Sequence, residues 1–214
     1  MIKKWEKYRK FLKNGAWHVH TNYTDGKNSV FEYCRQAEKL SMPLIAFTEH
    51  VRRKMDYDFQ DLRKEIEWAK KKFNLEIVLG CEAKVLDEKG NLDSSDDILK
   101  ESEIVLGSFH SAVLKNKKYF LKALKKMIKN PHVDIWAHPG LFYLRRNFNL
   151  SRKELDEITK LCTRNKVLIE INLKYNLPEK GLLSAAKKNK TKFIYGLDAH
   201  SIKDLELLGK SKIL

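Results

Sequence analysis

Six of the seven histidines stand at the ends of short apolar segments, together with acidic side chains. The first segment ends in Trp17-His18-Val19-His20, and the period of a strand points these two imidazoles to the same side. The other segment ends are Thr48-Glu49-His50, Gly80-Cys81-Glu82, Ser108-Phe109-His110, Ala137-His138-Pro139-Gly140 and Leu197-Asp198-Ala199-His200. Only His132, in Asn130-Pro131-His132, is typical of a surface turn. One such pair carries little weight, but the recurrence indicates a shared site.

Neutral imidazoles with carboxylates, and no cluster of thiolates, suit divalent ions such as zinc, manganese or iron. The candidate metal ligands are His18, His20, Asp25, His50, Glu82, His110, His138, Asp198 and His200. Nine ligands exceed what one ion uses, so we expect two or three ions bridged by a carboxylate. Water or hydroxide held by such ions is a nucleophile near neutral pH. The sequence therefore predicts a metal-dependent hydrolase.

These side chains need a scaffold that brings the segment ends together. Short runs rich in β-branched residues alternate with charged stretches of helical apolar spacing, which predicts repeated strand-then-helix units. The predicted strands are residues 16–20, 44–48, 76–82, 104–109, 133–138, 167–172 and 193–198. This alternation allows an open doubly wound sheet or a closed barrel. Because the polar residues fall at the carboxyl ends of the strands, which meet on one rim of a β/α barrel, we favour the barrel.

Two helices have clear signals. One has apolar residues at spacings of three and four, namely Val30, Tyr33, Cys34, Ala37 and Leu40. Another begins with Ser151 and Glu154, the pattern of a capping box.

The first residues form a separate element in this interpretation. Residues 1–15 have Trp5, Tyr8, Phe11 and Leu12 at helical spacing, which predicts a helix that packs over the bottom of the barrel or binds a partner. Residues 16–214 are then the barrel domain.

The composition narrows the class of protein. A length of 214 residues and a hydrophobic fraction of 43% fit one globular domain, and no stretch approaches the roughly 20 apolar residues of a membrane span. The charged start is unlike a secretory signal, so we expect a cytoplasmic protein. Cys34, Cys81 and Cys162 are far apart, which argues against disulfides and a structural zinc knuckle. The oligomeric state is left open.

The net charge of +15 favours an anionic partner, either a small phosphorylated molecule or, as the weaker alternative, a nucleic acid. Most lysines lie in helical stretches, where a solvated face explains them equally well. Phosphate recognition also needs cations near the ligands. The candidates, each of which competes with a plain solvent-facing role, are Arg52, Arg53, Arg145, Arg146, Lys84 and Lys174.

The ordered set of motifs resembles the PHP (polymerase and histidinol phosphatase) domain superfamily over about residues 16 to 200. The matching residues are His18-Val19-His20, Asp25-Gly26, Thr48-Glu49-His50, Glu82, His110, His138-Pro139 and Asp198-Ala199-His200. The resemblance implies a distorted seven-stranded (β/α)7 TIM-like barrel. Glu82-Ala83-Lys84-Val85-Leu86-Asp87 and Glu170-Ile171-Asn172 are similar to the monofunctional, histidinol-phosphatase-like branch, although Lys174 stands where that branch has an arginine.

The resemblance also implies how the ligands divide. His18, His20, Glu82 and Asp198 share one ion, and Glu82 bridges to a second ion held by His110 and His138. A third ion falls to Asp25, His50 and His200, where some members have a histidine near the position of Asp25.

The leading hypothesis is a phosphomonoesterase that hydrolyses a small phosphorylated metabolite by metal-activated hydroxide. His50, His200 and Glu82 are the catalytic candidates; the general acid is His50, His200 or a metal-bound water. The first alternative is a nuclease or phosphodiesterase that acts on nucleic acid. The second is a metal-binding module without catalytic activity.

Overall fold

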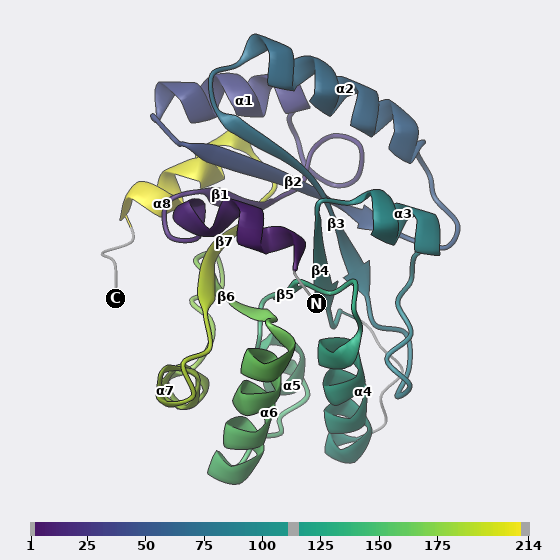
Figure 1. Ribbon diagram of the computed structural model, residues 1–214, viewed down its shortest axis with the longest axis vertical. Coiled ribbons are helices and arrows are strands. Elements are labelled where there is room, and N and C mark those ends of the chain that lie inside the picture. Colours follow the sequence, from purple (N-terminus) through teal and green to yellow (C-terminus); the bar gives the residue numbers. More distant parts are fainter. Residues whose placement is uncertain (1–2, 111–115, 211–214) are drawn as a thin grey trace.

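Every strand pairs in parallel with its neighbours in the chain, and β7 pairs with β1, so that the sheet closes into a barrel (Figure 1). The structure is a computed structural model that describes residues 3–110 and 116–210. The strands are β1 Ala16–Val19, β2 Leu44–Val51, β3 Glu76–Lys84, β4 Ile104–Ser108, β5 Ile135–Trp136, β6 Leu168–Asn172 and β7 Phe193–Ala199. The predicted seven-stranded α/β barrel is confirmed, and the open sheet is excluded.

Alternating side chains give each strand two apolar faces, as expected of parallel strands covered on both sides. The lower interior of the barrel is filled by a compact layer that includes Leu44, Val78, Leu106, Ile135, Leu168 and Ile194. The outer face packs under the helices with residues that include Ile45, Ile77, Val105, Trp136, Ile169 and Leu197. The lower interior of the barrel is therefore a packed apolar core, and the candidate ligands lie above it at the carboxyl-terminal end.

The helices lie around the outside of this sheet. They are α1 Val30–Lys39, α2 Phe59–Lys72, α3 Asp96–Glu101, α4 Lys117–Lys129, α5 Leu141–Arg145, α6 Arg152–Asn165, α7 Lys180–Lys188 and α8 Glu206–Lys210, with the 3-10 helix η2 Ile202–Leu205 before α8. In Figure 1, α1 and α2 run side by side at one end of the view, and α4 and α6 lie at the other. The capping box of Ser151 and Glu154 is present. Leu40, predicted on the buried face, is 39% exposed because α1 ends at Lys39.

The amino-terminal segment closes the bottom of the barrel. It forms η1, Lys4–Phe11, in which two short stretches of 3-10 helix meet at Tyr8. Trp5 and Tyr8 are buried in the interior layer and are fixed by hydrogen bonds from Trp5 Nε1 to Lys166 O (2.8 Å) and from Tyr8 Oη to Glu103 Oε1 (2.7 Å). In this segment Trp5, Tyr8 and Leu12 pack against the interior layer, and the helix that carries Trp5 and Tyr8 is a 3-10 helix. Residues 1–2, 111–115 and 211–214 of the predicted ranges lie outside the described residues.

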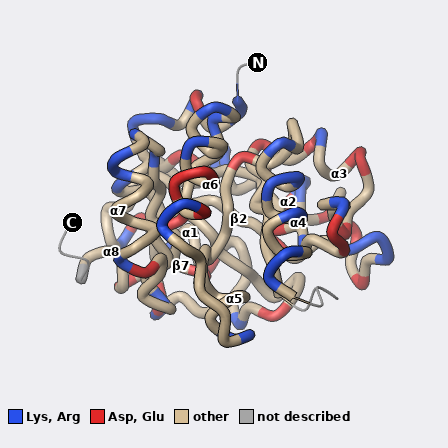
Figure 2. The backbone as a smooth tube through the Cα atoms, turned by 90° about the horizontal axis from the view of Figure 1, so that it is seen from below, with Lys and Arg blue, Asp and Glu red and all other residues tan. Residues whose placement is uncertain are grey.

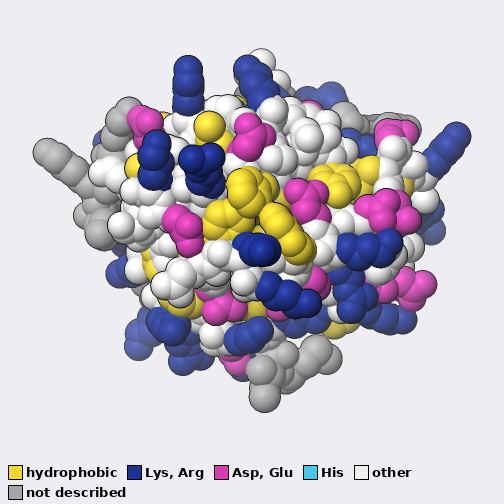
Figure 3. Space-filling view, turned by 90° about the horizontal axis from the view of Figure 1, so that it is seen from above, with side chains coloured by type: hydrophobic (Ala, Val, Ile, Leu, Met, Phe, Trp, Pro, Cys, Tyr) yellow, Lys and Arg dark blue, Asp and Glu magenta, His cyan; other side chains and the backbone are white. Residues whose placement is uncertain are grey.

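The Lys and Arg residues are spread over the helices, as the blue segments of the backbone in Figure 2 show. Several are paired on the surface, for example Lys64 with Asp61 (2.9 Å) and Lys125 with Glu157 (3.0 Å). On the face formed by α1 and α2, hydrophobic side chains gather between these charges (Figure 3), with Phe31 5.0 Å from Phe73 between ring centroids. No helix in residues 3–110 and 116–210 is long and apolar enough to cross a bilayer.

Candidate metal centre

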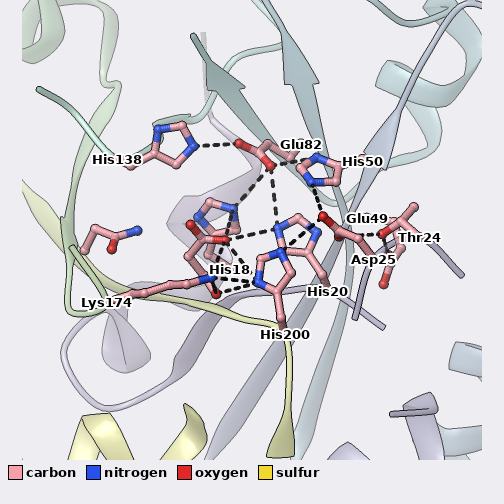
Figure 4. A network of polar contacts seen from close by, with 12 residues as sticks. His18, His20, Thr24, Asp25, Glu49, His50, Glu82, His138, Lys174 and His200 are labelled. Carbon is pink, nitrogen blue, oxygen red and sulfur yellow. Dashed lines mark hydrogen bonds and ion pairs between the residues drawn. The ribbon is translucent and has the colours of Figure 1, made fainter. Parts of the chain in front are cut away.

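The nine candidate ligands converge at the upper end of the barrel, although they come from sequence positions almost two hundred residues apart. Figure 4 shows the imidazoles of His18, His20, His50, His138 and His200 turned toward one another around Glu82. His18, His20, Glu82 and His138 are buried, whereas the side chain of Asp25 is 55% exposed at the edge. The centre is therefore buried on the side of the barrel interior and open to solvent at the edge where Asp25 lies.

At three of the candidate ligands the backbone leaves the ordinary strand conformation. His18, His138 and Asp198 have φ values of 66°, 28° and 47°, in the left-handed region that non-glycine residues rarely adopt. The pairing of β1 shifts register around His18, so that Trp17 and His18 both face the interior. The predicted strand at 133–138 is likewise reduced to Ile135–Trp136. Such local strain is typical of functional sites.

Glu82 stands at the middle of the cluster. Its Oε1 lies 2.9 Å from both His110 Nε2 and His138 Nε2. Its Oε2 lies 2.9 Å from His50 Nδ1, 3.4 Å from His18 Nε2 and 3.5 Å from His20 Nε2. A single carboxylate that faces five imidazoles has the geometry of a bridging ligand.

The other two carboxylates lie on either side of His200. Asp198 Oδ1 is 3.6 Å from both His20 Nε2 and His200 Nδ1. Asp25 Oδ2 is 3.3 Å from His200 Nε2 and 3.5 Å from His50 Nε2. Each of the three ligand sets implied by the family resemblance is thus a group of neighbouring atoms.

Metal ions fit this donor set. Within the described residues, His18 Nε2, both ring nitrogens of His20, His50 Nδ1 and Glu82 Oε2 are buried without a hydrogen-bond partner. Buried polar atoms in proteins are normally satisfied, so a cluster of orphans that face one another needs another partner. Four overlapping triplets have ligand atoms within 4.8 Å of each other, and they consist of imidazole nitrogens and carboxylate oxygens, the donors that divalent ions such as zinc take.

The electrostatics of the protein without metal reflect this crowding. Burial lowers the pKa of His50, but the carboxylates of Asp25 and Glu82 on either side of its ring outweigh burial and raise that pKa to about 10. Burial would raise the pKa of Glu82, yet the surrounding imidazoles, above all His110 and His18, hold it well below its usual value. Protons on histidine therefore balance the buried negative charge when no metal is present.

Metal binding is expected to release protons. With a pKa of about 10, His50 is protonated at pH 7, whereas a ligand imidazole must be neutral, so an incoming ion displaces at least this proton. Apparent metal affinity should then fall as pH is lowered, by about tenfold per pH unit for each proton released. Calorimetric titration of metal-free protein with metal, in two buffers of different ionisation enthalpy, measures the number of protons released. Equal heats in the two buffers would contradict this expectation.

Glu170, which was not among the candidate residues of the sequence analysis, supports the centre. Its carboxylate is fully buried and accepts hydrogen bonds from His18 Nδ1 (2.7 Å) and from the backbone N–H of His138. This arrangement fixes the ring of His18 so that Nε2 faces Glu82. The signal for Glu170 in the sequence was a charged residue inside the otherwise apolar segment that forms β6.

Glu49 is a second buried carboxylate that the sequence interpretation left without a function. It accepts hydrogen bonds from Thr21 N (2.7 Å) and from the hydroxyl of Thr24, which holds the loop that carries Asp25 (Figure 4). Burial raises the pKa of Glu49 to about 7.

The six candidate cations differ in their distance from the centre. Lys174 Nζ lies 3.0 Å from both His200 Nδ1 and the carbonyl oxygen of Asp198. Arg52 lines a pocket of about 250 Å³ together with Asp25, His50 and Tyr57. The other four have neighbours outside the ligand cluster. Lys84 Nζ lies 3.6 Å from Asp93 Oδ2, and the backbone N–H of Arg53 donates to Asp93 Oδ1 (3.1 Å). The guanidinium carbons of Arg145 and Arg146 lie 6.0 Å and 5.5 Å from the ring centroids of Tyr175 and Phe142.

The PHP domain family model matches residues 17–174, which is most of the chain. The chain belongs to the PHP domain family. The match ends before β7, so Asp198 and His200 join the centre on the evidence of the structure alone. Membership in this family agrees with the predicted activity of a metal-dependent phosphoester hydrolase. This PHP domain also carries a cluster of histidines and carboxylates that is able to hold divalent metal.

Relatives of this PHP domain include two kinds of enzyme. It is 28% identical to the DNA polymerase/3'-5' exonuclease PolX of Bacillus subtilis (strain 168), over 90% of the chain but only 35% of PolX. It is 26% identical to a probable phosphatase of Clostridium novyi (strain NT), over 86% of the chain and 77% of that protein. Among solved structures, its fold is similar to histidinol phosphate phosphatase of Lactococcus lactis subsp. lactis Il1403, complexed with zinc, L-histidinol and phosphate. That similarity has a TM-score of 0.67 and 19% identity, and it covers 94% and 95% of the two chains.

Proposed function

We propose that this PHP domain is a phosphomonoesterase that hydrolyses a small phosphorylated metabolite, in the manner of a histidinol phosphatase. The observation that carries the proposal is the nine-ligand cluster with Lys174 at its edge, since a phosphoryl group needs both metal ions and a nearby cation. The nine ligands are proposed to hold two or three ions of zinc, manganese or iron. Bound ions supply the polarisation of phosphoryl oxygens and the activated water that attacks phosphorus.

The chain's own residues would orient the substrate. Lys174 reaches the centre from the loop after β6, and Arg52, directly after β2, lines a pocket beside Asp25 and His50. This pocket has a volume of about 250 Å³, and its wall includes Tyr23 and Tyr57. A pocket at or below the roughly 300 Å³ of ordinary ligand sites suits a small leaving group.

Two of the predicted catalytic residues have geometry that favours metal binding. His50 lies between Asp25 and Glu82, and His200 lies between Asp25 and Asp198, so both rings are enclosed by carboxylates. We therefore propose them first as ligands. The proton for the leaving group then comes from water at the open side of the centre.

Purified protein loaded with manganese or zinc is expected to hydrolyse p-nitrophenyl phosphate. A chelator should abolish the activity, and renewed addition of metal should restore it, because the catalytic power lies in the bound ions. Bis(p-nitrophenyl) phosphate serves as the matched diester and should be the poorer substrate. Metal-replete protein that hydrolyses none of a wide range of monoesters and diesters would leave the metal-binding module without catalysis as the function.

The alternative function, a nuclease, is favoured by the relationship to PolX. It predicts diester activity above monoester activity and binding of oligonucleotides that weakens steeply with salt. Filter binding at low salt separates the two functions, since a metabolite phosphatase has no reason to retain an oligonucleotide.

A further inference from the structure

Strand β6 places three side chains inside the barrel at successive heights. Leu168 belongs to the apolar lower layer, and Glu170 lies above it in contact with His18. The side chains between them alternate outward, since Ile169 packs in the outer core. By the same period of two, Asn172 faces the interior at the upper end of the strand, one layer above Glu170.

The orientation of the Asn172 amide is fixed. Its Oδ1 accepts a hydrogen bond from the backbone N–H of Tyr175 (3.0 Å), so that the nitrogen must occupy the other position. Asn172 is fully buried, and within the described residues its Nδ2 has no hydrogen-bond partner. A buried N–H group without an acceptor is costly, so a donor held in this way points to an oxygen that arrives from outside the chain.

The neighbours of Asn172 belong to the metal centre on both sides. On β7 its pairing partner is Gly196, two residues before Asp198. The loop that Asn172 caps brings Lys174 Nζ to within 3.0 Å of His200 Nδ1 and the ring of Tyr175 to 6.4 Å from that of His138. Asn172 therefore lies at the end of β6, between β5, which His138 follows, and β7, which carries Asp198 near its end.

We propose that Asn172 Nδ2 donates a hydrogen bond to a phosphoryl oxygen of the substrate, beside the ammonium group of Lys174. The inference rests on the proposed function and names a substrate-binding residue of that site. A neutral donor suits this place, because the positive charge nearby is already balanced by the carboxylates of Asp198 and Glu82. The pair gives one neutral and one charged donor for oxygens on the same phosphoryl group.

The test uses two substitutions at Asn172 and inorganic phosphate as the probe. Asn172→Asp keeps the oxygen that accepts from Tyr175 N but removes the donor, and Asn172→Ala removes the donor without adding charge. In metal-loaded protein, both should weaken phosphate binding in calorimetric titration by about 10- to 100-fold, the loss expected of a hydrogen bond to a charged group. KM for p-nitrophenyl phosphate should rise while metal content by elemental analysis stays unchanged.

Asn176→Asp is the matched control, because it adds the same charge to an exposed position of the same loop, and its φ of 53° is one that Asp tolerates. It should bind phosphate as the unmodified protein does. Asn172→Ala with unchanged phosphate affinity overturns the proposal even if Asn172→Asp binds weakly, since repulsion alone would then explain the result. Loss of metal from both Asn172 variants overturns it as well, because the amide would then support the ligands.

A measurement on the unmodified protein does not depend on variants that fold. With ¹⁵N-labelled asparagine, the side-chain NH₂ signal of Asn172 should shift when phosphate is added to metal-loaded protein, and a constant signal contradicts the proposal. A failure of the proposed function can be distinguished from a failure of the Asn172 contact. Protein that binds phosphate through Asn172 and hydrolyses no monoester refutes the function and leaves this contact intact.

Discussion

Glu82→Gln is expected to lower kcat/KM for phosphomonoesters by about 1,000-fold or more and to remove at least one metal ion per chain. The substitution keeps the size of the side chain but replaces an oxygen that faces several imidazole nitrogens with an NH₂ group. An amide cannot bridge two cations as a carboxylate does, and removal of one preorganised electrostatic group alone costs about 100- to 1,000-fold in rate.

Elemental analysis and steady-state kinetics on the same preparation check this prediction. The unmodified protein should also gain thermal stability when zinc is added, because a ligand that binds only the folded state stabilises it, and Glu82→Gln should lose most of that gain. Glu157→Gln is the control: it removes a carboxylate that is 45% exposed and paired with Lys125 on the surface. Full metal content together with low activity in Glu82→Gln would show that Glu82 is not a metal ligand.

Gly196→Ala is expected to weaken metal affinity by about 10- to 100-fold, although residue 196 itself offers no ligand atom. A methyl group at this position would lie 1.7 Å from Glu170 Oε1. The carboxylate would have to leave its place, and His18 Nδ1 and the backbone N–H of His138 would lose their acceptor. Overpacking of this kind also lowers the free energy of unfolding, typically by about 1–3 kcal/mol.

A double-mutant cycle tests whether the effect passes through Glu170. In a Glu170→Ala background the added methyl group has no carboxylate to displace, so Gly196→Ala should change metal affinity by less than about threefold. Gly209→Ala is the neutral control, since a methyl group there meets nothing within 4 Å. Additive losses in the cycle would mean that Gly196 acts independently of Glu170.

The location of the centre followed from the sequence for a physical reason. In a parallel β/α sheet all strands point the same way, so residues at the carboxyl ends meet at one edge whatever the order of the strands. His50, Glu82 and His110 were therefore predicted as neighbours, and in the structure Glu82 lies 2.9 Å from a ring nitrogen of each histidine. The apolar pattern likewise predicted the strands and the capping box at Ser151, because both depend on contacts close in the sequence.

Only the tertiary structure decided what depends on backbone detail and on contacts distant in sequence. A period of two cannot predict that His18 and His138 adopt left-handed backbone, since the barrel imposes those bends. The partnership of Glu170 with His18 joins residues 152 positions apart. Which cation reaches the centre was undecided for the same reason: Lys174 does so because Asn172 caps its loop, whereas Lys84 is paired with Asp93. Position along the chain was thus enough to predict that the candidate ligands lie together, whereas the residues that support them were fixed by the closure of the barrel.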